Sequence, residues 1–446
     1  MQADSDTTDE PRTFAVVTLG CPKNAVDSDK ITGSLMADGL TAAAGPETAD
    51  LIVLNTCAFI DSARRESIDT ALDLADLRKD GAQLVVTGCL AERAGDELAA
   101  AMPEVDAVIG FDGAGSIAPV TFRSAPTGVR DLLELPRAAP TRPWAYLKVA
   151  EGCDRQCAFC AIPTFRGKQR SRTPDAIFEE AKALVAGGVR EIILVAQDIA
   201  WYGRDSEDIA ATLTDIIRRL DTLAADGLQR QRLLYLYPSE VKDPLISTML
   251  ELETVVPYFD LSLQHASLPL LRRMRRYGSG ALFTGLIEGI RSRQPDAAFR
   301  SSFIVGFPGE TEDDHEALLE FLQAAELDWA GFFPYSAEAG THAVTLNGAV
   351  PEALVRERLS ECEEIQTRIT AARRDLRVGS QVDVLVDWVD AAGTAWGRTF
   401  AETPEIDGII RVASERLLTM GEIVRVQLHE SVGVDMVASP LSPGAE

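Results

Sequence analysis

The sequence predicts an α/β protein of several domains: a doubly wound parallel-sheet domain at the amino end, a partial (βα)6 barrel, and a small antiparallel β-barrel at the carboxyl end. The first two domains are indicated by short apolar runs that alternate with helical stretches from Thr13 onward. The same alternation resumes at Trp144 after an interruption. After Val378, apolar and polar residues alternate with a period of two, which indicates the third domain. A chain of 446 residues is long enough for two or three separate cores.

Changes in composition set the domain boundaries that we expect. Residues 1–12 are polar and acidic without periodicity, which predicts a disordered tail. Prolines mixed with arginines predict a linker over residues 126–143. The three expected domains are therefore residues 13–125, 144–377 and 378–440.

Three cysteines come just after predicted strands of the first domain. Cys21 follows the first strand, Cys57 the second and Cys89 the third. The expected strands are Phe14–Leu19, Leu51–Leu54, Leu84–Val86 and Val105–Ile109, and the expected helices lie around Ser28–Asp38, after Phe59 and after Leu90. Because parallel strands end at one edge of their sheet, we expect the three sulfurs to be neighbours that bind a metal centre. The alternative is that these cysteines only fill the core.

A second group of three cysteines, Cys153, Cys157 and Cys160, follows the first strand of the predicted barrel with the spacing CxxxCxxC. Thiolates suit zinc or an iron–sulfur cluster. A closed zinc site needs four ligands, whereas three leave one position open. An iron–sulfur cluster with an open iron can bind a small molecule there and pass it an electron. A chance arrangement of cysteines is the remaining alternative.

Six strands are expected in the barrel: Ala145–Val149, Glu191–Ala196, Leu233–Leu236, Phe259–Leu263, Ser302–Val305 and Gly331–Phe333. Active sites of barrels lie at the carboxyl ends of the strands. Gln197, Gln264, His265 and Gly306 occupy such positions and are candidate site residues. A glycine there would let the backbone approach a ligand closely. The alternatives are turn or capping roles, and a structural role for His265.

Composition limits the class of partner and compartment. The formal net charge is −26, and residues 378–446 contain eleven Asp or Glu, four Arg and no Lys. Nucleic-acid binders usually present a basic face, so direct RNA binding is disfavoured and a basic protein partner is favoured. The acidity could also serve solubility alone. No apolar run approaches the roughly 18 residues of a membrane span, and the acidic start is unlike a signal peptide, so we expect a cytoplasmic protein without a membrane partner.

A basic run, Arg166 to Arg172, is an exception in this acidic chain. Arginines can bind carboxylates with two hydrogen bonds, so the run could hold the carboxylate of a small molecule or of an acidic substrate. The alternative is a solvated turn.

Several motifs together resemble the radical S-adenosylmethionine (SAM) methylthiotransferases over about Thr13 to Ala438. They are Leu19–Asn24 (LGCPKN), Asn55–Ala63 (NTCAFIDSA), Thr87–Leu90 (TGCL), Glu151–Pro163, Leu263–Ser267 (LQHAS) and Pro404–Gly408 (PEIDG). The resemblance implies an amino-terminal cluster domain, a radical-SAM domain and a TRAM barrel. Within the family the chain resembles the RimO branch, which methylthiolates the β carbon of an aspartate in ribosomal protein uS12. The MiaB branch, which modifies adenosine in tRNA, has GCQMN and PVQSGS where this chain has GCPKN and LQHAS.

The resemblance also implies cofactors and roles. Cys153, Cys157 and Cys160 would hold a 4Fe–4S cluster that binds and cleaves SAM, and Cys21, Cys57 and Cys89 would hold a second 4Fe–4S cluster that carries the donated sulfur. Phe159, Gln197 and Gly306 are candidates for contact with SAM, and a reducing electron donor is required. Two other functions stay open: a MiaB-like enzyme acting on tRNA, and a zinc-binding protein without catalysis.

Overall fold

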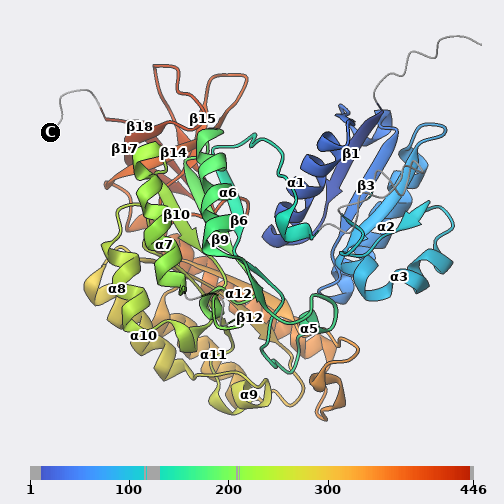
Figure 1. The fold of residues 1–446 in the computed structure, drawn as a ribbon. Helices are drawn as coiled ribbons and strands as arrows, with labels where there is room; N and C mark the ends of the chain where they lie inside the picture. Colours follow the sequence, from blue (N-terminus) through green and yellow to red (C-terminus); the bar gives the residue numbers. More distant parts are fainter. Residues whose placement is uncertain (1–11, 115–116, 118–130, 207–208, 210, 442–446) are drawn as a thin grey trace, which may run out of the picture. The chain divides into compact units, whose positions relative to one another are not determined.

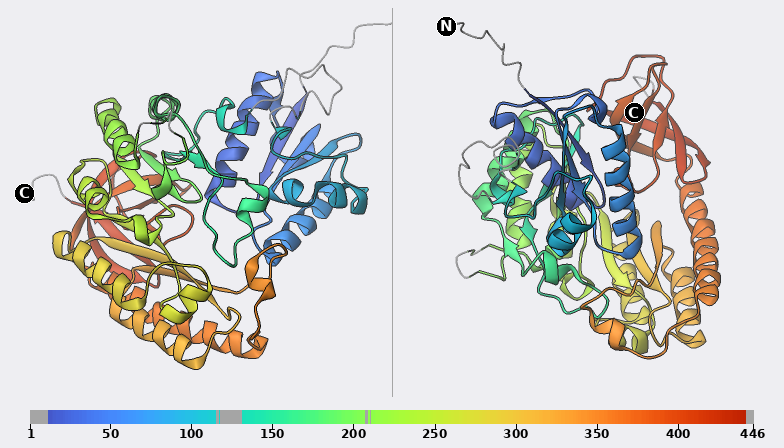
Figure 2. Two further views of the ribbon diagram at one scale, coloured as in Figure 1. Left: turned by 60° about the horizontal axis from the view of Figure 1, so that its bottom comes forward. Right: turned by 90° about the vertical axis from the view of Figure 1, so that its right-hand side faces the viewer.

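The computed structural model describes residues 12–114, 117, 131–206, 209 and 211–441 (Figures 1 and 2). The chain divides into two compact units, Met1–Ala139 with Thr164–Arg166, and Pro140–Pro163 with Gly167–Glu446. Nearly all of the expected tail, residues 1–11, lies outside the described residues, as do residues 126–130 of the expected linker. None of the helices in the described part of the chain has both the length and the apolar character that crossing a membrane requires.

The first unit contains a five-stranded sheet in the order β2-β1-β3-β4-β5, and every pair in it is parallel. Its strands are β1 (Thr13–Thr18), β2 (Thr41–Ala42), β3 (Leu51–Thr56), β4 (Gln83–Gly88) and β5 (Ala107–Val108). The predicted parallel sheet is thereby confirmed, with the two-residue edge strand β2 in addition. Because the strand order reverses between β1 and β3, the carboxyl edge at these two strands is the switch point where such sheets bind ligands.

Three main helices accompany this sheet: α1 (Pro22–Ala37), α2 (Asp61–Leu77) and α3 (Cys89–Ala101). Helix α1 begins six residues before the expected Ser28, with Pro22 in its first turn. Proline suits that position because its missing N–H has no partner inside the helix. The early part of α1 buries polar side chains, among them Asn24 and Asp27, so apolar periodicity does not reveal it.

Part of the segment expected to be a linker packs on the first unit. Leu132 and Leu133 of the short 3₁₀-helix η3 (Leu132–Glu134) are buried there, as is Leu135 just after it. The buried Lys30 ammonium donates to the carbonyl oxygens of Leu133 at 2.7 Å and of Leu135 at 3.3 Å. Residues 131–139 therefore extend the core of this unit.

The second unit begins with six parallel strands in chain order, which confirms the partial barrel. They form the sheets β10-β9-β6 and β11-β12-β13, joined by a bridge between Leu236 and Leu261. The strands are β6 (Trp144–Lys148), β9 (Glu191–Val195), β10 (Arg230–Leu233), β11 (Tyr258–Gln264), β12 (Ala298–Val305) and β13 (Trp329–Pro334). A short antiparallel pair, β7 (Ala150–Glu151) and β8 (Arg170–Ser171), lies between β6 and α6 in the chain.

Helices cover one side of these strands (Figure 2). They are α6 (Pro174–Ala186), α7 (Leu213–Asp221), α8 (Asp243–Glu251), α9 (Leu268–Arg273), α10 (Gly280–Arg293), α11 (Glu312–Ala325) and α12 (Glu352–Asp375), whereas the single turn α5 (Ile162–Phe165) belongs to the segment after the second cysteine group. Short 3₁₀ turns lie at η4 (Ile199–Trp201), η5 (Thr222–Asp226), η6 (Pro238–Glu240) and η7 (His342–Thr345). The core between the layers is closely packed, as the stacked Phe259 and Phe299 rings show with centroids 5.5 Å apart.

A closed barrel follows α12, in the order β14-β15-β16-β18-β17. Its strands are β14 (Gln381–Val389), β15 (Ala395–Arg398), β16 (Ile410–Val412), β17 (Ile423–Val432) and β18 (Asp435–Pro440). The expectation of an antiparallel barrel needs one correction, because β16 and β18 pair in parallel to close it. The sequence pattern indicates strands at Val382–Val386, Gly408–Val412 and Ile423–Leu428, and the structure adds β15 and β18.

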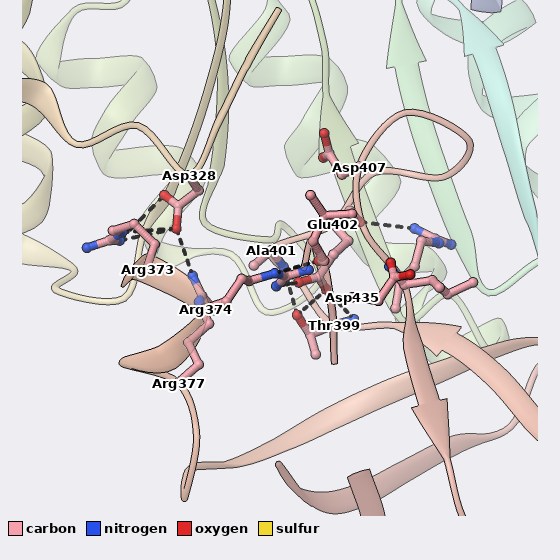
Figure 3. Close-up of polar contacts among 12 residues, drawn as sticks. Asp328, Arg373, Arg374, Arg377, Thr399, Ala401, Glu402, Asp407 and Asp435 are labelled. Carbon is pink, nitrogen blue, oxygen red and sulfur yellow. Dashed lines mark hydrogen bonds and ion pairs between the residues drawn. The ribbon is translucent and has the colours of Figure 1, made fainter. Parts of the chain in front are cut away.

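Arginines at the end of α12 form ion pairs both with the partial barrel and with the small barrel (Figure 3). Arg373 and Arg377 pair with Asp328, and Arg374 pairs with the fully buried Glu402. Glu402 in turn accepts a hydrogen bond from the Thr399 amide at 2.8 Å. The ion pair between Arg374 of α12 and Glu402 therefore fixes the loop that leads from β15 to β16.

Candidate functional site

The first cysteine group lies at the switch-point edge of the amino-terminal sheet. Cys21 is the residue before α1, Cys57 follows β3, and Cys89 is the first residue of α3. Thr18, Asn55 and Thr87 lie side by side in register across β1, β3 and β4. Each of the three cysteines comes two or three residues after one of these side-by-side residues. Cys57 and Cys89 are each only 7% exposed. The structure thus places all three on one edge, as the sequence predicts.

Two glycines allow these loops to approach each other. Gly20 has φ +92°, and a Cβ there would lie 2.9 Å from the Cys57 Sγ. Gly88 has φ +90°, and a Cβ there would lie 2.3 Å from the Asn55 Oδ1. Both positions require a left-handed backbone and leave no room for a side chain.

An asparagine joins the three loops. The Asn24 amide nitrogen donates to the carbonyl oxygens of Leu19 and Thr56, each at 2.9 Å. The Cys89 thiol lies 3.6 Å from the Asn24 Oδ1. One buried side chain therefore contacts the segments that carry Cys21, Cys57 and Cys89.

The three thiols differ in their readiness to ionise. Burial raises the pKa of Cys57 to about 11 and also raises the pKa of Cys89, although Arg166 opposes the latter shift. At Cys21 burial acts in the same direction, but Lys23, Arg166 and backbone N–H groups outweigh it and lower the pKa. Because thiolate is the form that binds metal, loading this site must release protons from Cys57 and Cys89.

Replacing Gly88 by alanine should destabilise the first unit and reduce its iron content. The left-handed backbone alone costs about 1–2 kcal/mol for a residue with a Cβ, and contact with Asn55 adds to that cost. Gly39→Ala is the matched control, because Gly39 has φ +91° with open space around it. Denaturant unfolding and iron analysis of both variants measure the difference. Equal losses of stability and of iron in the two variants would contradict the role of Gly88 in shaping the sheet edge that carries Cys21, Cys57 and Cys89.

The second cysteine group lies in the loop after β7, at the carboxyl ends of the barrel strands. Gly152 opens the loop with φ +78°, and a Cβ there would lie 2.1 Å from the Lys168 carbonyl oxygen. The Cys160 amide donates to the Cys157 carbonyl oxygen at 3.2 Å, and the Arg155 amide lies 3.4 Å from the Cys153 Sγ. The backbone turns tightly enough to keep all three cysteines in one loop.

Two arginines accompany these thiols. Arg276 donates to the Cys157 Sγ at 3.3 Å. Arg155 pairs with Asp198 at 2.7 Å and with Glu240 at 3.2 Å. Both guanidinium groups lie 4.0 Å from the centre of the Tyr237 ring. Their positive charge next to the loop favours an anionic centre there.

Burial dominates the ionisation of this group. It raises the pKa of Cys153 to about 11 and the pKa of Cys160 to about 12. Among the described residues, no three His, Cys, Asp or Glu side chains converge on one position that a single metal ion could occupy. In a 4Fe–4S cluster each cysteine binds a different iron, so its sulfurs lie farther apart than the ligands of one ion. Three thiols beside arginines are a donor set that fits such a cluster.

Gln197 lies at the end of β9, beside the cysteine loop. Its amide nitrogen donates to Glu151 at 2.5 Å, and Glu151 also pairs with the buried Lys148 at 2.6 Å. Within the described chain, the Gln197 Oε1 and the Asp198 Oδ1 are buried and accept no hydrogen bond. Buried acceptors normally have partners, so these two atoms are available to donors of a bound small molecule.

The other two candidates for contact with SAM have partners in the protein. Phe159 is half-buried against the hydrophobic core of its unit. The Gly306 amide donates to the Glu310 carboxylate at 2.6 Å, and a Cβ at Gly306 would lie 2.5 Å from the Val355 side chain. The close approach that the glycine allows is therefore to helix α12.

Gln264 and His265 end β11 in different environments. Gln264 is half-buried and has φ +72°, an uncommon conformation for a residue other than glycine. His265 is fully buried, and its Nδ1 accepts from the Ser267 amide at 3.1 Å. Burial lowers the pKa of His265 to about 3, so the ring is neutral. These contacts favour the structural alternative for His265.

Three family models match successive parts of the chain: Uncharacterized protein family UPF0004 over residues 13–110, the Radical SAM superfamily over residues 147–322, and the TRAM domain over residues 378–441. A protein from Cutibacterium acnes named ribosomal protein uS12 methylthiotransferase RimO is 40% identical over 97% of this chain and 98% of its own length. A protein of the same name from Aquifex aeolicus is 40% identical over 95% of this chain and 96% of its own length. The chain belongs to the RimO family.

Two solved structures are similar to parts of this chain, and the first of them supports the fold and nothing beyond it. The cobalamin-dependent SAM radical enzyme OxsB, in its apo form, is 11% identical with a TM-score of 0.50, covering 80% of this chain and 56% of that chain. The SAM methyltransferase TsrM from Kitasatospora setae is 16% identical with a TM-score of 0.47, covering 73% and 75% of the two chains. Membership of the radical-SAM superfamily brings SAM and a 4Fe–4S cluster as cofactors of this RimO-family chain.

Proposed function

We propose that this RimO-family chain is a radical-SAM methylthiotransferase, which inserts sulfur and a methyl group at the β carbon of an aspartate in ribosomal protein uS12. Relatives along nearly the full length carry that activity in their names. The observation that carries the proposal is the presence of two separate three-cysteine groups, each at the carboxyl edge of its own parallel sheet. One group suits radical formation, and the other suits storage of the sulfur.

Cys153, Cys157 and Cys160 would hold the cluster that binds SAM. When bound and reduced, this cluster supplies the electron that cleaves SAM. Arg276 and the backbone N–H of Arg155 donate to the cysteine sulfurs and orient them. The unpartnered oxygens of Gln197 and Asp198 would accept hydrogen bonds from SAM at the neighbouring strand end.

Cys21, Cys57 and Cys89 would hold the second 4Fe–4S cluster. Asn24 fixes the spacing of their loops, and the left-handed Gly20 and Gly88 keep side chains out of the space between them. Three ligands leave one iron open to a sulfur donor. Iron analysis after anaerobic reconstitution should therefore find about eight irons per chain, the number expected for two such clusters.

The charge of the small barrel supports a protein substrate. Eleven Asp or Glu against four Arg in residues 378–446 would repel a nucleic-acid backbone and attract a basic ribosomal protein. We infer that the chain does not bind tRNA directly, and that a separate reducing protein or small molecule supplies electrons.

Mass spectrometry of cells lacking the gene tests this function. The uS12 peptide should lose its methylthio group completely and regain it when the gene is restored, while methylthioadenosine in tRNA should stay unchanged. The opposite pattern would assign the MiaB-like function. A protein that binds zinc after anaerobic reconstitution and does not cleave SAM would establish the non-catalytic alternative.

A further inference from the structure

The first arginine of the basic run contacts the sulfur edge of the amino-terminal unit. Arg166 belongs to that unit, and its side chain is only 3% exposed. Its guanidinium donates to the Cys89 Sγ from Nη2 at 3.1 Å and from Nε at 3.4 Å. Arg166 is therefore neither part of a solvated turn nor free to clamp a substrate carboxylate.

The same guanidinium contacts two side chains of α1. Its Nη2 donates to the Asn24 Oδ1 at 2.6 Å, and its Nη1 pairs with the Asp27 Oδ2 at 3.1 Å. It also lies 4.4 Å from the centre of the Phe111 ring, and Asp27 is 1% exposed. Because Asn24 in turn contacts the two other cysteine loops, Arg166 completes a buried polar network around all three cysteines.

We propose that Arg166 is a positioning residue that sets the electron affinity of the cluster held by Cys21, Cys57 and Cys89. The inference rests on the second cluster of the proposed function. Hydrogen bonds to the cysteine sulfur withdraw charge from it, and a buried positive charge stabilises the more negative, reduced cluster. Asp27 offsets part of that charge. The pair thereby tunes how readily the sulfur-carrying cluster accepts an electron.

This role predicts that replacing Arg166 and replacing its ion-pair partner Asp27 shift the reduction potential of the cluster in opposite directions. Arg166→Met removes a positive charge and two donors, so the reduction potential should become more negative. Asp27→Asn removes a negative charge beside Arg166, so the potential should become more positive. Arg166→Lys keeps the charge but not the planar fork, so its shift should be smaller than that of Arg166→Met. Loss of packing alone would not give shifts of opposite sign.

The experiment uses the full chain with Cys153, Cys157 and Cys160 replaced by alanine, so that only the first cysteine group can hold iron. After anaerobic reconstitution, a potentiometric titration followed by visible absorption and electron paramagnetic resonance gives the potential of that cluster in each variant. Arg137→Met is the matched control, because Arg137 also pairs with an α1 carboxylate, Asp29 at 2.5 Å. The contacts described for Arg137 are with Asp29, so the cluster in the Arg137→Met variant should have the same reduction potential as in the parent.

The outcomes separate the two proposals. Equal potentials in Arg166→Met and Arg137→Met would overturn the role of Arg166 and leave the second cluster intact. Failure of the parent, with Arg166 present, to bind about four irons would overturn the second cluster and the role of Arg166 together. If Arg166→Met holds no iron, the signs and sizes of the shifts in Arg166→Lys and Asp27→Asn decide, and shifts of the same sign would overturn the proposal.

Discussion

Replacing Cys153, Cys157 and Cys160 together by alanine is expected to abolish SAM cleavage and to leave about four irons per chain. The three thiols are the ligands proposed for the SAM-binding cluster, and without that cluster no electron reaches SAM. The other cysteine group belongs to a different compact unit with its own core. The absorption spectrum of the cluster held by Cys21, Cys57 and Cys89 should therefore persist. Reversed-phase separation of 5′-deoxyadenosine and methionine after reduction with dithionite measures the loss.

Cys362→Ala is the control for this triple variant. Cys362 is fully buried in α12, where burial raises its pKa to about 12, and it has no place in either cysteine group. Its replacement should leave both clusters and SAM cleavage unchanged, with only a modest loss of stability. SAM cleavage at the parental rate by the triple variant would contradict the assignment. Loss of both cluster spectra would contradict the independence of the two groups.

The cysteine positions could be predicted from sequence because each group follows apolar runs that form parallel strands. Once Cys21, Cys57 and Cys89 are placed after successive strands, the geometry of a parallel sheet brings them to one edge. The same argument locates the other group after β6. This prediction needs no knowledge of conservation or of contacts between distant residues, because the positions of the apolar strands and of the cysteines in the sequence are sufficient.

The supporting side chains could not be predicted in this way. Arg166 reaches Cys89 across 77 residues of sequence, and Arg276 reaches Cys157 across 119 residues. Neither contact leaves a local pattern, and the arginine run alone left two interpretations open. Asn24 lies in the LGCPKN motif, but its bonds to two other loops depend on the strand order that reverses at β1 and β3.

Gly306 and His265 follow strand ends, which made them candidate site residues, but the structure gives each of them partners within the protein. Gly306 was a candidate for backbone contact with SAM, yet its left-handed conformation accommodates Val355 and presents its amide to Glu310. The fully buried His265 accepts a hydrogen bond from the Ser267 amide, and the Ser267 hydroxyl bonds to Asp314 of α11. Sequence patterns locate close packing at these positions, and only the structure identifies the partner.

Glu191→Gln is expected to destabilise the second unit by about 3–5 kcal/mol at neutral pH, the range found when one partner of a buried ion pair is removed. Glu191 begins β9 and is fully buried. Its carboxylate accepts from Arg232 at 2.7 Å and pairs with Arg398 of the small barrel at 2.8 Å. Glutamine keeps the shape but leaves two buried guanidinium groups with too little negative charge.

The pH dependence of this loss has a defined sign. Burial opposes ionisation of Glu191, but Arg398, Arg232 and Arg230 outweigh it and lower its pKa from 4.5 to about 2. A carboxylate with a depressed pKa contributes stability that is complete above the unfolded pKa and declines as pH falls toward the folded one. The difference between wild type and Glu191→Gln should therefore be largest at pH 7 and fall by about half near pH 3.

Tryptophan fluorescence during denaturant unfolding measures this difference, because all five tryptophans lie in the second unit. Glu405→Gln is the control, since Glu405 pairs with Arg142 where both side chains are about half exposed. Such a surface pair contributes about 0–1 kcal/mol. Because Glu191 lies at the amino end of β9, away from the cysteine loop, the folded Glu191→Gln variant should still cleave SAM. A loss of stability that stays constant from pH 7 to pH 3 would contradict the role of the Glu191 charge in holding the small barrel.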